Sequence, residues 1–184
     1  MFGECHAHVI MDGINYKAAV ALHKDSVCEA AVRAHLKEWK DAGIIFVRDG
    51  GDARGASKKA KELAPEYGID YRTPVFAIHK CHHYGGIVGL PFDTWTEYEA
   101  LVLKAKGEGA DFIKIMVSGI LDFAHAGTLT EDGLDRESIR RMIGTAHDAG
   151  MAVMAHCNGN QTCYETLEAG VDSLEHGFFM EEET

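Results

Sequence analysis

The sequence predicts an α/β fold built around a parallel sheet. Segments with helical character repeatedly end in a glycine, and a short apolar run follows each of these glycines. The repeat from Gly43 to Gly170 averages ~32 residues, which is about the size of one βα unit. Glycine just past a helix end adopts the left-handed conformation at little cost. Apolar runs of this length suit strands that are buried on both faces, as parallel sheets require.

The elements follow from these runs in chain order. Six strands are expected, near residues 2–6, 44–48, 70–76, 111–116, 152–156 and 173–176. Five helices are expected between them, at residues 25–41, 56–66, 94–107, 135–149 and 161–169. Thr94, with Glu97 three residues later, matches a helix capping box, and Asp135 is a good N-cap residue. The alternation of strands and helices predicts the parallel sheet.

Composition limits the class of protein and its partners. The chain has 184 residues, 46% of them hydrophobic and 26% charged, which is typical of one globular domain. The formal net charge of −11 argues against nucleic acid as a partner, and no apolar run is long enough to span a bilayer. Five cysteines without paired spacing indicate reduced thiols. We therefore expect a cytoplasmic protein that acts on a small-molecule substrate, without a nucleic-acid or membrane partner.

Histidines gather where active residues of parallel α/β proteins lie, at the carboxyl ends of strands. His6 and His8 close the first apolar run, and residues two apart on a strand point to the same face. His156 and His176 close the fifth and sixth runs. Taken singly, each is more often a core or strand-end residue. Taken together, they form a candidate ligand set.

Lys114 is the sharpest single feature, because it interrupts an apolar run that should be a buried strand. An unpaired buried ammonium is costly. The side chain could reach solvent or pair with Glu4, Asp49 or Glu175. Alternatively, a neutral lysine amine could take up carbon dioxide and become an anionic carbamate, which can bridge two divalent metal ions.

These side chains would converge at one mouth of a barrel. Imidazole nitrogens with a carboxylate-like bridge suit zinc, and suit other divalent metals less specifically. Two metals about 3.5–4 Å apart can activate a bridging water and polarise a scissile carbonyl.

The sequence resembles the amidohydrolase superfamily of metal-dependent hydrolases, most closely its imidazolonepropionase-related and Xaa-Pro dipeptidase-like branch. The matching residues are His6 and His8 in His-Ala-His, Lys114 in Ile-Lys-Ile-Met-Val-Ser-Gly, His156 in Met-Ala-His-Cys-Asn-Gly, and His176 in Leu-Glu-His-Gly. The resemblance implies a (β/α)8 TIM barrel. It also implies a binuclear metal centre of zinc, manganese or another divalent ion, with carbamylated Lys114 and these four histidines as ligands. The reaction implied is hydrolysis of an amide, peptide or cyclic amide C–N bond by metal-activated water.

The resemblance stops short of a complete barrel. About six of the eight strands are expected, so residues 1–184 are interpreted as a single partial barrel domain without strands 7 and 8 or the flanking β-domain. The aspartate that the family places at the end of strand eight has no counterpart here, and the catalytic residues stay unassigned. We expect a truncated hydrolase whose open edges favour a homo-oligomer. The alternative is a catalytically incomplete metal-binding fragment. A mononuclear deaminase is disfavoured because Cys157-Asn158-Gly159 stands where that enzyme class has a glutamate.

Other candidates carry weaker signals. Residues 79–84 are expected on a loop after the third strand, where His83 and Tyr84 would contact substrate; a solvated loop is equally compatible. Residues 48–51 either support the site or form a plain turn. The remaining histidines are predicted at the surface: His23, His35, His125 and His147.

Overall fold

The computed structural model describes residues 1–184 and confirms the α/β class. The chain divides into two compact units, residues 1–76 and 77–184. Each unit holds one sheet, of three and five strands respectively, and every strand pair is parallel. Neither sheet closes into a barrel. None of the helices combines the length and apolar character needed to cross a membrane.

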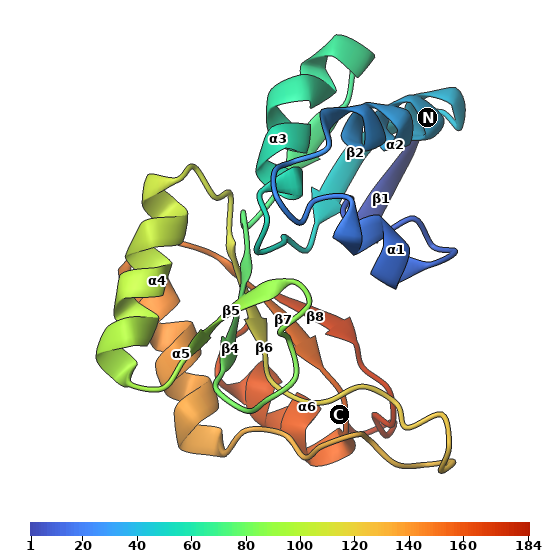
Figure 1. Cartoon of the computed structure of the whole chain (residues 1–184). Coiled ribbons are helices and arrows are strands. Elements are labelled where there is room, and N and C mark those ends of the chain that lie inside the picture. The colour runs from blue at the N-terminus through green and yellow to red at the C-terminus, as the bar shows by residue number, and fades with distance from the viewer. The chain divides into compact units, whose positions relative to one another are not determined.

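The first unit is a three-stranded sheet in the order β1-β2-β3, with α2 and α3 on one face (Figure 1). Its core is formed by side chains such as Val47 of the sheet and Leu36 of the covering helix. The elements are β1 (Phe2–Ala7), α1 (Tyr16–Ala21), α2 (Glu29–Asp41), β2 (Ile44–Asp49), α3 (Ala56–Leu63), the 3-10 helix η1 (Ala64–Tyr67) and β3 (Asp70–Arg72).

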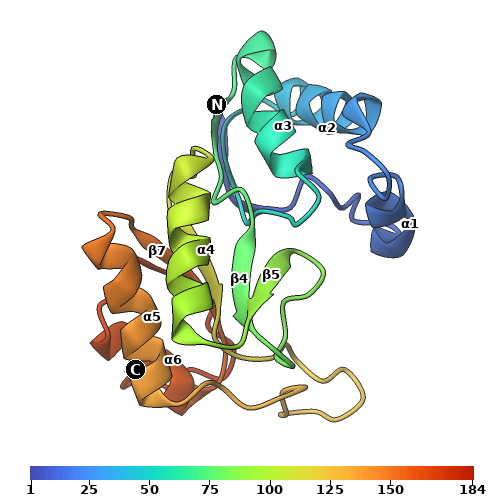
Figure 2. The same ribbon diagram turned by 60° about the vertical axis from the view of Figure 1, so that its left-hand side comes forward.

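The second unit is a five-stranded sheet in the order β5-β4-β6-β7-β8. Two of its helices, α4 and α5, lie side by side (Figure 2), and the Tyr98 hydroxyl of α4 donates to the Met142 carbonyl of α5 at 2.8 Å. Its elements are β4 (Ala77–Lys80), β5 (Gly89–Phe92), α4 (Trp95–Gly107), β6 (Ile113–Met116), α5 (Arg136–Asp148), β7 (Val153–Cys157), α6 (Asn160–Glu168) and β8 (Ser173–His176). The predicted caps at Thr94 and Asp135 are confirmed.

Four short elements differ from those that the sequence predicts. The strand expected at 70–76 ends at Arg72, since Pro74 lacks an N–H and Val75 has φ of 67°. Strands β4 and β5 occupy residues that the sequence assigned to a loop and its surroundings. Pro91 argues against a strand, yet β5 lies at the sheet edge, where proline is tolerated. Helix α1, of six residues, is too short to show a period.

The register of the second sheet separates an apolar face from a polar one. Lys114 is level with Ala77 of β4 and Met154 of β7, and Met116 is level with His156. Strand alternation therefore places Lys114 and His156 on one face. The side chains that alternate with them in β6 and β7 are apolar and buried: Ile113, Ile115, Val153 and Ala155. We assign this second set to the helix-covered face, because helices bury an apolar stripe against a sheet.

Candidate active site

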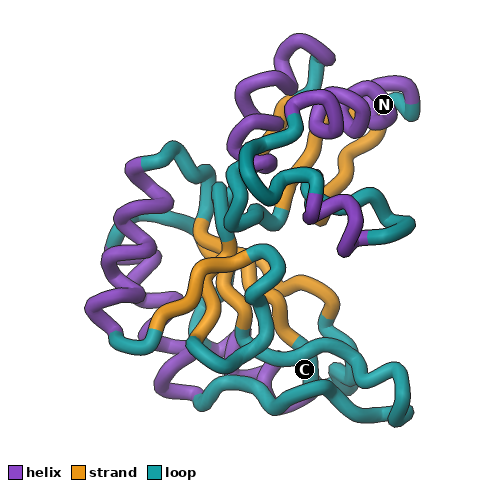
Figure 3. The backbone as a smooth tube through the Cα atoms, in the orientation of Figure 1, coloured by secondary structure: helices purple, strands orange, loops and turns teal.

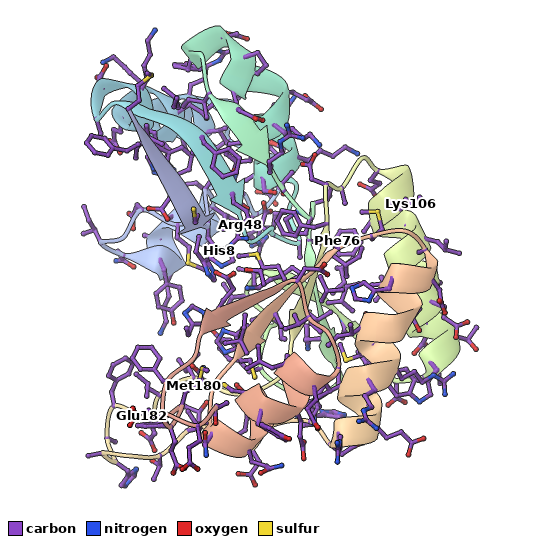
Figure 4. All side chains as sticks on the ribbon, turned by 180° about the vertical axis from the view of Figure 1, so that it is seen from behind. His8, Arg48, Phe76, Lys106, Met180 and Glu182 are labelled. Carbon is purple, nitrogen blue, oxygen red and sulfur yellow. The ribbon has the colours of Figure 1, made fainter.

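The first unit holds a histidine pair at the end of β1. The ring centroids of His6 and His8 are 5.4 Å apart. His8 (Figure 4) has Nδ1 3.1 Å from the Gly51 carbonyl oxygen. Since a carbonyl only accepts, Nδ1 carries the proton and the lone pair lies on Nε2. Metal-ligating histidines typically have this second hydrogen bond to a backbone carbonyl or carboxylate.

The motif at residues 48–51 supports His8 directly. A Cβ on Gly50 would lie 2.4 Å from Cε1 of His8, so any other residue at this position would force the ring to move. Buried Asp49 accepts hydrogen bonds from the N–H groups of Val9 and Gly51, at 2.7 and 2.6 Å, and from the Tyr71 hydroxyl at 2.7 Å. Burial raises the pKa of Asp49, and these hydrogen bonds oppose the rise. The motif is therefore more than a plain turn, because it fixes the carbonyl that orients His8.

The second unit buries Lys114 and His156 on the same sheet face. Lys114 is 1% exposed, so its side chain does not reach solvent as the first alternative required. In the neighbouring strand it is level with Met154, two residues before His156. A buried amine next to a buried imidazole is an expensive arrangement for a stable core. Its presence marks this face as a candidate for chemistry.

His176 joins this face through an irregular backbone. The register pairs His176 with Cys157 rather than His156, so regular alternation would direct its ring to the opposite face. His176 instead has φ of 71°, in the left-handed region that only glycine adopts cheaply. Its ring lies 4.7 Å from the His156 ring, centroid to centroid. The backbone irregularity thus brings two predicted ligands together.

His79 lies in a different element from the one that the sequence predicts. It lies in β4 rather than on a loop, and by register it is level with Met116 on the face of His156. The side chain is 6% exposed; Nδ1 donates to the Lys80 carbonyl at 2.9 Å, while buried Nε2 has no hydrogen-bond partner. Buried polar atoms are rarely left unsatisfied. The apolar run at 75–78 that precedes it was the available signal for a strand.

Tyr84 and His83 follow β4 on a loop, as predicted. The Tyr84 ring packs against His156 with 4.9 Å between centroids. Its backbone N–H donates to the Glu131 carboxylate, and His83 Nδ1 lies 3.9 Å from the same Glu131 oxygen. Glu131 belongs to the long connection between β6 and α5, drawn as loop in Figure 3. The structure therefore brings Tyr84 to a predicted ligand, and its contact with substrate stays a prediction.

One of the histidines predicted at the surface is buried. His23 is 3% exposed, and its Nδ1 accepts a hydrogen bond from the Cys28 N–H at 3.2 Å. Burial lowers the pKa of His23. His35 is half-buried against the Val9 carbonyl, whereas His125 and His147 are exposed as predicted.

The five predicted metal ligands are divided between the units. His6 and His8 lie in the first, and Lys114, His156 and His176 lie in the second. No group of three or more His, Cys, Asp or Glu side chains in the structure is arranged to hold a metal ion. The donor chemistry fits a divalent ion such as zinc, because His8 has a tautomer set by a backbone carbonyl. The complete five-ligand centre stays a prediction.

Comparison with known proteins defines the class of fold. No family model and no curated protein matches the chain. A prolidase complexed with N-methylphosphonate-L-proline matches 99% of this chain over 48% of its own, at 20% identity and a TM-score of 0.73. Two further structures match 98% of this chain at 20% identity. Ochratoxinase from A. niger is matched over 47% of its own length with a TM-score of 0.74. A Xaa-Pro dipeptidase with bound methionine is matched over 48% of its own length with a TM-score of 0.68.

The chain thus shares its α/β fold with these solved structures. It spans about half the length of the solved structures it matches. Another match, an amidohydrolase, has a TM-score of 0.68 at 21% identity. At this level of identity the matches show a shared fold, in agreement with the α/β fold that the sequence predicts.

Proposed function

We propose that this chain belongs to a metal-dependent hydrolase that cleaves an amide, peptide or cyclic amide C–N bond. The observation that carries the proposal is the polar sheet face of the second unit, where buried Lys114 and His156 share one side of adjacent strands. An ordinary α/β core would place apolar side chains there. The fold similarity to prolidase and Xaa-Pro dipeptidase structures supports the same class.

In this proposal His6, His8, Lys114, His156 and His176 hold one or two divalent ions, zinc or manganese. A bound divalent metal supplies Lewis-acid activation of water and of the scissile carbonyl. The Gly51 carbonyl keeps the His8 proton on Nδ1 and presents the Nε2 lone pair. The neutral amine of Lys114 adds to carbon dioxide with formation of an N–C bond and loss of one proton. The product is a carbamate, whose single negative charge is shared by two oxygens.

The substrate side is assigned to the loop after β4. Tyr84 lies against His156, and we propose that it contacts the part of the substrate next to the scissile bond together with His83. Solved structures with the same fold are named for prolidase and Xaa-Pro dipeptidase activity. Dipeptides with a C-terminal proline are therefore the first substrates to test, followed by cyclic amides.

Metal analysis of protein produced with zinc or manganese tests the proposal. We expect about one or two ions per chain, and a loss on changing both His6 and His8 to alanine. His147→Ala is the matched control, because His147 is an exposed histidine outside the proposed set. Less than about one ion per chain, with no effect of the double substitution, would overturn the proposal.

Turnover separates the two candidate functions. Hydrolysis of Xaa-Pro dipeptides or cyclic amides by this chain supports a hydrolase. Metal binding without turnover supports the metal-binding fragment, in which the same side chains hold the ion and no general base is present.

A further inference from the structure

Three loops of the second unit meet on one buried side chain, Asn158. It follows β7 and is 1% exposed. Its backbone N–H donates to the Ser118 hydroxyl at 2.8 Å, and Nδ2 donates to the Gly119 carbonyl at 3.0 Å. Its Oδ1 accepts from the Phe178 N–H at 3.1 Å. Asn158 therefore joins the loops after β6 and β8 to the end of β7.

The same Gly119 carbonyl contacts His156. The His156 Nε2 atom lies 3.1 Å from Gly119 O and 3.3 Å from Asn158 Nδ2. If Nε2 carried a lone pair, that pair would face the lone pairs of the carbonyl. The repulsion is avoided when Nε2 carries the proton, so that Nε2 and Nδ2 donate side by side to one oxygen. The lone pair of His156 then lies on Nδ1.

The other end of the Asn158 amide holds the turn that follows His176. His176 and Gly177 have φ values of 71° and 64°, two consecutive left-handed residues. A non-glycine residue in this conformation is strained and persists only where its surroundings hold it. The Phe178 N–H donates to Asn158 Oδ1, and the Phe178 carbonyl accepts from the Gly159 N–H at 2.8 Å. These two bonds clamp the chain two residues beyond His176.

We propose that Asn158 is a positioning residue for both histidines. Its Nδ2 group holds the Gly119 carbonyl that keeps the proton on Nε2 of His156, and its Oδ1 atom holds the turn that brings the His176 ring to His156. The metal-binding consequence rests on the proposed function. The tautomer and the turn do not, because they belong to the metal-free chain.

The test is the His156 tautomer, measured on the metal-free full chain by long-range ¹H–¹⁵N correlation of the histidine rings. In the wild type we expect protonated Nε2 and unprotonated Nδ1. Asn158→Leu removes the donor and acceptor at similar size and should give a mixture of tautomers. Asn158→Asp retains the acceptor for Phe178 and offers the His156 Nε2–H a carboxylate, so the wild-type tautomer should return.

Asn160→Leu is the matched control. Asn160 also accepts a backbone N–H from the segment after β8, that of Glu181 at 3.0 Å, but has no contact with His156. It should leave the tautomer unchanged. If Asn158 only ties the loops together, Asn158→Leu should lower the stability of the chain and leave the His156 tautomer unchanged. That result would overturn the proposal. If the Asn158→Leu chain does not fold, the wild type still tests the proposal, because a His156 ring protonated on Nδ1 would overturn it.

Zinc titration separates this inference from the proposed function. If the wild type binds zinc, Asn158→Leu should weaken the affinity by about 10- to 100-fold. Absence of zinc binding in the wild type, with a tautomer that still responds to Asn158→Leu, would overturn the proposed function and support the positioning role. An unresponsive tautomer would overturn the positioning role whatever the zinc affinity.

Discussion

The rings of His156 and His176 lie 4.7 Å apart although the strand register pairs His176 with Cys157, on the opposite face of the sheet. The left-handed φ of His176 produces this contact. A conformation that costs stability and gathers two imidazoles is a feature of sites rather than of cores.

His176→Gly should separate the strain from the role of the ring. Glycine accepts the left-handed φ, so the free energy of unfolding should rise by roughly 1 kcal/mol, while zinc affinity falls because a ligand is lost. Urea unfolding and zinc titration measure the two effects. Phe179→Gly relieves the strain of a similar φ of 68° at a residue outside the ligand set. It should leave zinc affinity unchanged. Equal zinc affinity in His176→Gly would remove His176 from the ligand set.

Gly50→Ala should disturb the first unit locally. The new methyl group would lie 2.4 Å from the His8 ring, so the ring must move. The contact between His8 Nδ1 and the Gly51 carbonyl would then be disturbed. We expect destabilisation of about 1–3 kcal/mol and weaker zinc binding. Gly144→Ala in α5, where a Cβ meets nothing within 4 Å, should instead stabilise the chain by about 0.5–1 kcal/mol. A Gly50→Ala chain with native stability and zinc affinity would contradict the packing described here.

Lys114→Met should preserve stability and abolish function. Replacing a buried charged group with an apolar side chain of similar size is often neutral or stabilising, by up to about 4 kcal/mol. Metal content should fall, and the ¹³C carbamate resonance expected after incubation with ¹³C-labelled bicarbonate should disappear. Lys40→Met, at an exposed position of α2, should retain both. Wild-type protein that gives no carbamate signal with metal bound would exclude carbamylation of Lys114.

His23 should make the stability of the chain fall in mild acid. Burial lowers the pKa of His23 below its ordinary value of 6.5, so the folded state favours the neutral ring. Its contribution is fully present above pH 6.5 and is lost as pH falls through the lower, folded-state pKa. Protonation also removes the acceptor of the Cys28 N–H. Urea unfolding from pH 7.5 to 5 should therefore show a smaller loss in His23→Gln, and identical slopes would refute the assignment.

Edge strands should drive self-association, as the proposed homo-oligomer requires. Strand β1 has a partner on one side only, and its Phe2 side chain is 69% exposed. Light scattering should give a mass above the 20.1 kDa of one chain. Phe2→Lys should shift the protein toward monomer, because a charge on an edge strand opposes pairing. Phe123→Lys, at a 90% exposed loop position, should have no effect. A stable wild-type monomer would contradict the proposal.

The sequence was informative where a local pattern determines the structure. The glycine that ends each helix and the apolar run after it located β2, β6, β7 and β8, and the capping box located the start of α4. Strands β4 and β5 have four residues each, too few to show a period, and Pro91 obscured the second.

The arrangement of the candidate site depends on longer-range relations. No local pattern shows the φ of His176, and the residues that hold Asn158 come from loops about 20 and 40 positions away in the chain. His23 was misplaced for a similar reason, since charged groups near it, Asp52 and Arg54, come from a distant part of the chain. Residue identities therefore predicted which side chains to consider, and tertiary contacts determined how they are held.

The acceptor that orients His156 is a main-chain atom, so no side-chain replacement can delete it. Position 119 nonetheless tolerates little variation, because a Cβ there would lie 2.6 Å from the Thr130 hydroxyl and 2.7 Å from the Glu131 nitrogen. A mutational scan should therefore find Gly119 as intolerant as the histidines, although glycine has no reactive group. Design of new loops on this scaffold would have to replace the connections after β6, β7 and β8 together.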